Sequence, residues 1–163
     1  MPTMTPLPLE FKDLLKSLNS QEVEYLVIGG WAVIHYGYVR YTGDFDIWIA
    51  ASSDNADRLI RALKEFIGTA PEKRSIVELH KTIEFGNSPL RVHLMCDISG
   101  VEFQKCIKRK LQTDWEGIPV SVISFKDLLA NKKSTGRLKD LTDVDYFTKA
   151  QKLATSKKRK KTK

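Results

Sequence analysis

Short apolar runs and longer amphipathic stretches alternate along the chain. The short runs are rich in β-branched and aromatic residues, which predicts strands; they fall at 25–28, 44–49, 82–85, 91–96, 111–115 and 118–122. Apolar residues at helical spacing predict helices; these fall at 9–18, 31–37, 54–67, 101–110, 125–133 and 138–153. Residues 76–80 fit either a short strand or an irregular segment. The expected fold class is therefore α/β (α+β), a mixed β-sheet with helices packed against it and two C-terminal helices.

The stretch from 25 to 49 carries the most specific pattern. Its first strand ends at Gly29-Gly30, where glycine permits backbone angles that other residues avoid and lets a ligand approach the main chain. The helix predicted at 31–37 starts at this pair. A helix start with unbonded N–H groups is a ready phosphate site, so the pair is a candidate phosphate-binding turn.

The following strand carries two carboxylates. Asp44 and Asp46 alternate with Phe45 and Ile47, so strand geometry places both acids on one face and the apolar side chains on the other. Two adjacent carboxylates repel each other unless a cation lies between them. A phosphate-binding turn beside such a pair is typical of metal-assisted phosphoryl chemistry.

At this point the chain resembles a known family. Gly29-Gly30, thirteen intervening residues and then Asp44-Phe45-Asp46 resemble the signature of the nucleotidyltransferase superfamily, of the DNA polymerase β type. The fuller set of motifs is similar to small bacterial nucleotidyltransferase-like proteins related to the AbiEii toxins, through Arg40 and Thr42 and the segments 91–103 and 122–147. The resemblance covers most of the chain and implies a minimal nucleotidyltransferase fold.

The resemblance also implies an activity, namely transfer of a nucleoside monophosphate from an NTP to an acceptor. Asp44 and Asp46 would act in catalysis by holding Mg²⁺, or Mn²⁺ in its place. The expected acceptor is RNA, a partner protein or a small molecule, and a role in a toxin–antitoxin pair is a further expectation. The expected nucleotide-binding residues are Gly29, Gly30, Trp31, Arg40, Thr42, Lys132 and Lys133.

Plainer interpretations stand beside these. Arg40 also fits a solvated loop, and Thr42 fits the turn. Lys132 and Lys133 also fit a helix end, where cations oppose the negative pole of the helix. Nearby acids and bases also fit a structural ion-pair set, namely Lys139, Asp140 and Asp143.

One position departs from the family pattern. Members use a third carboxylate on a neighbouring strand, two residues after an arginine, and here His93 follows Arg91 at that spacing. Asp97 lies about 13 Å further along a continuous strand, so it would substitute only after a register shift or a β-bulge, which we do not expect. His93 is therefore expected either to act in catalysis as a general base or to mark a weakened enzyme. In the latter case the chain is a nucleotide- or nucleic-acid-binding module.

Composition and charge narrow the class of protein. The 163 residues, 42% hydrophobic and 29% charged, fit one domain at 1–151. The net charge of +7 comes from a basic tail at 152–163, which we expect to be disordered and to make weak nucleic-acid contacts. No stretch has the roughly 20 apolar residues of a membrane span. Cys96 and Cys106 fit buried thiols in a reducing cytoplasm, so a cytoplasmic protein is expected.

Overall fold

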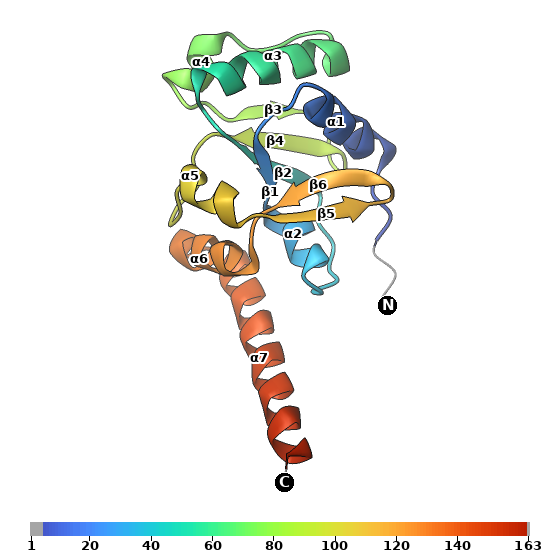
Figure 1. Ribbon diagram of the computed structural model, residues 1–163, viewed down its shortest axis with the longest axis vertical. Helices are drawn as coiled ribbons and strands as arrows, with labels where there is room; N and C mark the ends of the chain where they lie inside the picture. Colours follow the sequence, from blue (N-terminus) through green and yellow to red (C-terminus); the bar gives the residue numbers. More distant parts are fainter. Residues whose placement is uncertain (1–4, 163) are drawn as a thin grey trace.

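A computed structural model describes residues 5–162 and contains one six-stranded mixed sheet with helices on both faces (Figure 1). The strand order across the sheet is β3-β4-β2-β1-β6-β5. The pairs β1–β6 and β2–β4 are parallel, and the other three neighbouring pairs are antiparallel. The strands are β1 (Tyr25–Val27), β2 (Asp44–Ile49), β3 (Ile83–Phe85), β4 (Arg91–Met95), β5 (Leu111–Trp115) and β6 (Ile118–Val122). The expected fold class is confirmed.

The helices form two layers. In Figure 1, α1, α3 and α4 lie above the sheet, and α2, α6 and α7 lie below it. Their bounds are α1 (Leu9–Ser20), α2 (Gly29–His35), α3 (Ser53–Ile67), α4 (Lys73–Val77), α5 (Phe103–Cys106), α6 (Phe125–Thr135) and α7 (Leu138–Lys161), with a 3₁₀ turn at Ile107–Arg109 after α5. None of the helices within residues 5–162 is both long and apolar enough to cross a membrane.

Most elements fall where the sequence pattern predicts them. The hairpin of β5 and β6 has the predicted bounds. Ser52 caps α3 by accepting a hydrogen bond from the Asn55 N–H, and Ser124 caps α6 by accepting one from the Asp127 N–H. The segment at 76–80, left open between strand and irregular structure, instead overlaps the short helix α4. The single helix predicted at 101–110 is divided into α5 and the 3₁₀ turn.

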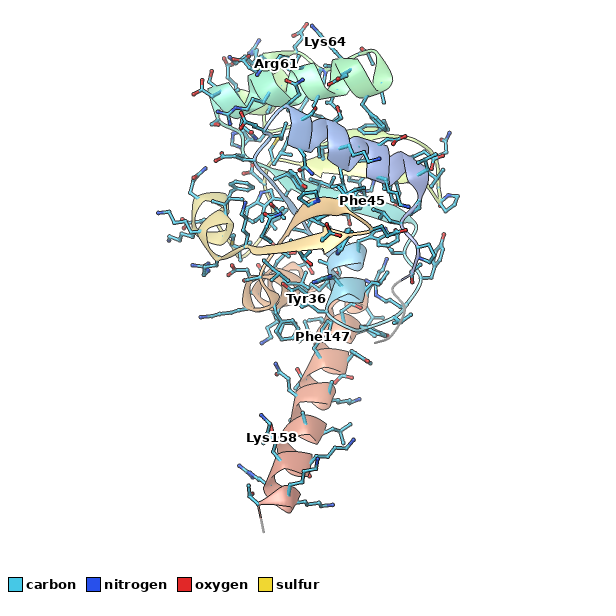
Figure 2. The ribbon with its side chains drawn as sticks, turned by 45° about the vertical axis from the view of Figure 1, so that its right-hand side comes forward. Tyr36, Phe45, Arg61, Lys64, Phe147 and Lys158 are labelled. Atoms are coloured by element: carbon cyan, nitrogen blue, oxygen red, sulfur yellow. The ribbon has the colours of Figure 1, made fainter. Side chains whose placement is uncertain are left out.

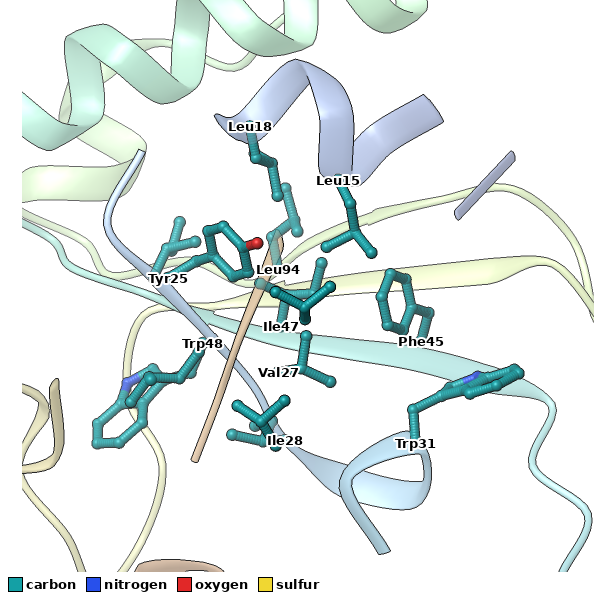
Figure 3. Packing of buried hydrophobic residues seen from close by; sticks show 14 of the residues in the cluster. Leu15, Leu18, Tyr25, Val27, Ile28, Trp31, Phe45, Ile47, Trp48 and Leu94 are labelled. Atoms are coloured by element: carbon teal, nitrogen blue, oxygen red, sulfur yellow. The ribbon is translucent and has the colours of Figure 1, made fainter. Parts of the chain in front are cut away.

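One part of the hydrophobic core lies between α1 and the sheet (Figure 3). Phe11 of α1 stacks on Phe45 of β2 with ring centroids 4.6 Å apart, and Leu15 and Leu18 pack beside them. Phe45 and Ile47 are fully buried on this side. Because successive strand residues point to opposite faces, this packing directs Asp44 and Asp46 to the other face, toward α2 and α6.

The last helix is longer than the sequence predicts. The sequence predicts a helix ending near Leu153 and a disordered tail after it, but α7 continues to Lys161. Beyond Phe147, which is itself buried, α7 leaves the body as a single projecting helix (Figures 1 and 2). The side chains at 148–162 are all exposed, so this half of α7 adds nothing to the hydrophobic core.

Candidate functional site

The carboxylate face of β2 forms one wall of a cleft of about 430 Å³, a volume within the usual range for small-molecule sites. The start of α2 and the loop before β2 form a second wall. The loop after β4 and the junction of α6 and α7 close the cleft. The charged and titratable side chains that line the cleft include Asp44, Asp46, His93, Lys132, Arg137 and Lys139.

Asp44 and Asp46 both line this cleft, as the alternation along β2 predicts. The pKa of Asp46 is raised, chiefly because burial disfavours its charged form, and the Asp44 charge raises it further. The neighbouring His93 opposes this rise through its charge and a hydrogen bond. A bound cation would offset both the cost of burying these charged carboxylates and their mutual repulsion. The pair therefore favours a positively charged ligand.

His93 lies beside Asp46 across the parallel strands β2 and β4. Its Nδ1 is 2.9 Å from Asp46 Oδ1, and its Nε2 is 3.7 Å from Glu84 Oε1 on β3. The side chain thus occupies the position expected for a third carboxylate. Asp97, which also lines the cleft, is 2.7 Å from His80 Nδ1 and has a 73% exposed side chain.

The metal-binding capacity of the cleft is therefore limited. Within residues 5–162, no three His, Cys, Asp or Glu side chains are grouped closely enough to hold a metal ion. Mg²⁺ in proteins is often held by only one or two carboxylates together with substrate phosphates. Asp44 and Asp46 therefore fit a cation that arrives with a triphosphate, and the residues present do not fit a second one.

The two glycines are required by close packing. A Cβ atom at Gly29 would collide with the Asp46 carboxylate, and one at Gly30 would collide with the Thr42 hydroxyl. Gly29 also has a φ of +64°, which side chains other than glycine rarely adopt. The Thr42 hydroxyl donates to the Asp44 carbonyl over 3.2 Å. The turn is thus packed against β2 at Gly29 and against the loop before β2 at Gly30.

Trp31 follows the glycines, but its side chain does not line the cleft. It is 4% exposed and lies in the aromatic core, with ring centroids 6.3 Å from Phe45 and 6.4 Å from Trp115. Its Nε1 is the one buried side-chain N or O atom without a hydrogen-bond partner among residues 5–162. Trp31 is expected to bind nucleotide, but α2 directs its side chain to the interior, so only its main chain is left to make that contact.

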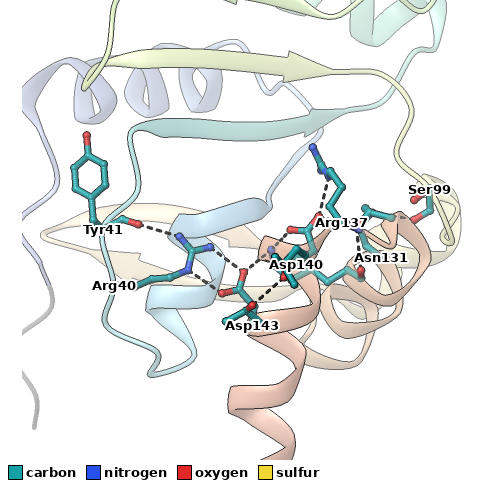
Figure 4. Close-up of polar contacts among 11 residues, drawn as sticks. Arg40, Tyr41, Ser99, Asn131, Arg137, Asp140 and Asp143 are labelled. Atoms are coloured by element: carbon teal, nitrogen blue, oxygen red, sulfur yellow. Dashed lines mark hydrogen bonds and ion pairs between the residues drawn. The ribbon is translucent and has the colours of Figure 1, made fainter.

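Arg40 and Lys132 lie at the cleft, but buried acids already pair with them (Figure 4). Arg40 binds Asp143 of α7 with both Nε and Nη2, at 2.8 and 2.9 Å. Lys132 Nζ contacts Asp140 at 2.8 Å and Asp143 at 2.9 Å. Lys132 is only 4% exposed, so both cations first serve an ion-pair network that joins the loop before β2 and α6 to α7.

Asp140 completes this network. It also accepts hydrogen bonds from the Thr135 hydroxyl at 2.6 Å and Arg137 Nε at 3.0 Å. Burial raises the pKa of Asp140, but the bonds from Lys132 and Thr135 outweigh burial and leave the pKa below its ordinary value. The structural ion-pair interpretation therefore holds for Asp140 and Asp143, while Lys139 forms none of the ion pairs found within residues 5–162.

The other predicted cation, Lys133, is exposed and does not line the cleft. Arg137 and Lys139 do line it, and both are exposed enough to meet a ligand. Asn131 lines it as well, donating to the Ser99 carbonyl over 2.9 Å. Spacing alone could not select these residues, because the α6–α7 junction determines which side of the basic cluster faces the cleft.

Comparisons with known proteins support the fold. No protein-family model and no curated protein matches the chain. Among solved structures, a candidate nucleotidyltransferase from Thermotoga maritima matches with a TM-score of 0.51 and 14% identity, over 90% of this chain and 91% of that one. The fold is nucleotidyltransferase-like. A nucleotidyltransferase-like antigenic protein from Paracoccidioides brasiliensis matches with a TM-score of 0.49 and 17% identity, over 86% of this chain and 75% of that one.

Proposed function

We propose that the cleft binds an NTP together with Mg²⁺ and transfers its nucleoside monophosphate to an acceptor hydroxyl. One observation carries the proposal: in a nucleotidyltransferase-like fold, Asp44 and Asp46 project from one strand face into a cleft beside the Gly29-Gly30 turn. The finer relation to the AbiEii group, and a place in a toxin–antitoxin pair, stay predictions.

Each wall of the cleft has a part in this proposal. Asp44 and Asp46 would hold Mg²⁺ (or Mn²⁺), which when bound offsets the charge that builds up on the phosphoryl oxygens. Gly29 and Gly30 line the cleft beside the carboxylates, so their main chain is accessible to the phosphates of a bound nucleotide. Arg137 and Lys139 supply positive charge from the opposite side. Phosphoryl transfer depends mostly on such positioning and charge stabilisation.

A second candidate function rests on His93. The histidine replaces an acid that the family uses on the acceptor side, and its Nδ1 is already bonded to Asp46. If no other group activates the acceptor, the chain is a nucleotide- or nucleic-acid-binding module with little transfer activity. If transfer occurs, His93 is the side chain placed to receive the acceptor proton. The acceptor, whether RNA, a partner protein or a small molecule, is left open by both candidates.

The first test is calorimetric titration of the wild type with each of the four NTPs, with and without Mg²⁺. We expect Mg²⁺-dependent binding that the pair Asp44→Ala/Asp46→Ala abolishes. The matched control, Asp13→Ala/Glu65→Ala, removes two carboxylates from α1 and α3 beyond the opposite face of the sheet. Failure of every NTP to bind would overturn the proposal. Binding that survives the loss of both aspartates would overturn the assigned site.

A further inference from the structure

The outer half of α7 carries more positive charge than any other helix within residues 5–162. We call residues 152–161 the basic arm. After Asp145, which pairs with Lys149 at 2.8 Å, the sequence contains no further acid. The arm carries six exposed cations: Lys152, Lys157, Lys158, Arg159, Lys160 and Lys161. Figure 2 shows Lys158 on the projecting helix, remote from Arg61 and Lys64 on α3.

The cations of the arm repel one another. Lys157 and Lys161 are four residues apart, and Lys158 and Lys161 are three apart, which are the spacings that bring helix side chains together. The negative pole at the helix C-terminus offsets part of this repulsion. Ion pairs offset none of it, because none of those found within residues 5–162 involves an arm side chain. A polyanion is the ligand whose binding would remove this repulsion.

The distribution of charge around the helix distinguishes between polyanions. Successive residues are about 100° apart around a helix axis, so Lys157, Lys158 and Arg159 point in different directions and the cations surround the arm. Leu153 is its one large apolar side chain, 63% exposed. A helix that lies in a membrane surface needs a continuous apolar face, which the arm lacks. The arm is therefore poorly suited to a lipid surface.

A duplex groove fits this distribution. Its two walls both carry phosphates, so a helix lying between them meets negative charge on opposite sides. The major groove of B-DNA is about 12 Å wide and an α-helix with its side chains is about 10–12 Å across. A duplex also has a higher charge density than a single strand. Both the shape and the charge of the arm therefore match duplex DNA.

We propose that the basic arm binds duplex DNA through its phosphates, lying along the major groove without reading the base sequence. Each cation that neutralises a phosphate releases counterions, and binding therefore weakens steeply as salt rises. This interaction does not depend on the nucleotide cleft, because every arm residue lies outside it.

The test is fluorescence anisotropy with a labelled 20-base-pair DNA duplex across a series of salt concentrations. The arm variant is Lys157→Gln/Arg159→Gln/Lys161→Gln, in which glutamine keeps a similar helix propensity. The control variant is Lys16→Gln/Arg61→Gln/Lys64→Gln, which removes equal charge from exposed sites on α1 and α3. Circular dichroism verifies that both variants keep their helices.

We expect the arm variant to bind at least tenfold more weakly, with a salt slope reduced by about three, because each lost phosphate contact contributes about 0.9. The control variant should change much less. Equal weakening by both variants would overturn the proposal, because it would show a response to net charge alone. Tighter binding to a labelled single strand, or to vesicles with anionic lipid, would also overturn it.

A separate calorimetric titration distinguishes this inference from the proposed function. Mg²⁺-dependent NTP binding should be the same in the arm variant and the wild type. DNA binding without NTP binding would support the DNA-binding role of the basic arm and overturn the proposed nucleotide site in the cleft. NTP binding without DNA binding would support the nucleotide site and overturn the role of the arm.

Discussion

Asp143 receives a two-point ion pair from Arg40, a residue 103 positions earlier in the chain. The Asp143 side chain is 1% exposed and Arg40 is 15% exposed. The pair fixes the loop before β2 to α7, and this loop carries Thr42, which packs on Gly30. The ion pair therefore contributes both to the stability of the domain and to the shape of the cleft.

Replacing Asp143 with asparagine should destabilise the protein strongly. The change leaves Arg40 without a carboxylate and Lys132 with Asp140 alone, and breaking a buried ion pair from one side costs about 3–5 kcal/mol. Urea unfolding measures this loss. Asp145→Asn is the matched control, because Asp145 pairs with Lys149 in solvent. This variant should unfold at the same urea concentration as the wild type. An equally stable Asp143→Asn variant would contradict the network.

Lys132 and Lys133 should differ sharply despite being neighbours. Lys132→Met leaves Asp140 and Asp143 close together and buried without their shared cation, so we expect a loss of several kcal/mol, about 3–5. Lys133→Met removes an exposed side chain outside the cleft and should change neither unfolding nor NTP binding. Thermal melts and NTP titration measure both effects. A binding defect in Lys133→Met alone would restore the original sequence prediction.

Gly29→Ala should impair the cleft more than its backbone strain explains. An alanine at a left-handed position costs roughly 1–2 kcal/mol, and here its Cβ would also displace the Asp46 carboxylate. Gly68→Ala is the control, since Gly68 has a φ of +79° but open space around its Cβ position. We expect similar unfolding penalties from backbone strain, with at least tenfold weaker NTP binding in Gly29→Ala only. Equal NTP affinities would refute the close-packing argument.

Stability should fall in acid through Asp140. Its pKa lies below the ordinary value of 3.8 in the folded protein, so its ionised form stabilises the fold. This contribution is fully present above pH 4 or so and is lost as pH falls through the lower, folded-state pKa. Unfolding measured between pH 7 and pH 3 should show a shallower acid loss in Asp140→Asn than in the wild type. Parallel curves would exclude Asp140 as a source.

His93→Asp tests which candidate function is correct. If the missing carboxylate limits transfer, restoring it should raise Mg²⁺-dependent transfer of labelled nucleoside monophosphate at least tenfold. The reason is that a third oxygen ligand would face Asp46 across the strands. His93→Asn removes the same imidazole without adding a carboxylate, so this control should not raise transfer. No gain in His93→Asp would count against the lost-ligand explanation.

The orientation of the acidic pair could be predicted from the sequence because it depends on local geometry. Alternation along β2 places Asp44 and Asp46 opposite Phe45 and Ile47, and the core against Phe11 confirms this arrangement. The β5–β6 hairpin was equally predictable, since its turn and both its strands are contiguous in sequence. The alternation of a strand and the position of a turn can both be predicted without knowing which distant residues will pack against them.

The missed features all depend on distant partners. Nothing near Arg40 in the sequence indicates that Asp143 will neutralise it, because α7 must first dock beside the cleft. Trp31 follows a glycine pair that suggested a nucleotide contact, but the seven-residue helix α2 directs it into an aromatic core built from three other elements. Asp97 lines the cleft because the chain leaves β4 after Met95 and bends there.

The uninterrupted course of α7 has a geometric consequence. Asp140 lies in the wall of the cleft and Arg159 lies on the basic arm, and one helix contains both. At 1.5 Å per residue they are separated by about 29 Å along the helix axis. A flexible linker would let this distance vary, whereas a continuous helix acts as a spacer of constant length. Only a long ligand, such as about nine stacked base pairs at 3.4 Å each, can touch both ends, and a free mononucleotide cannot.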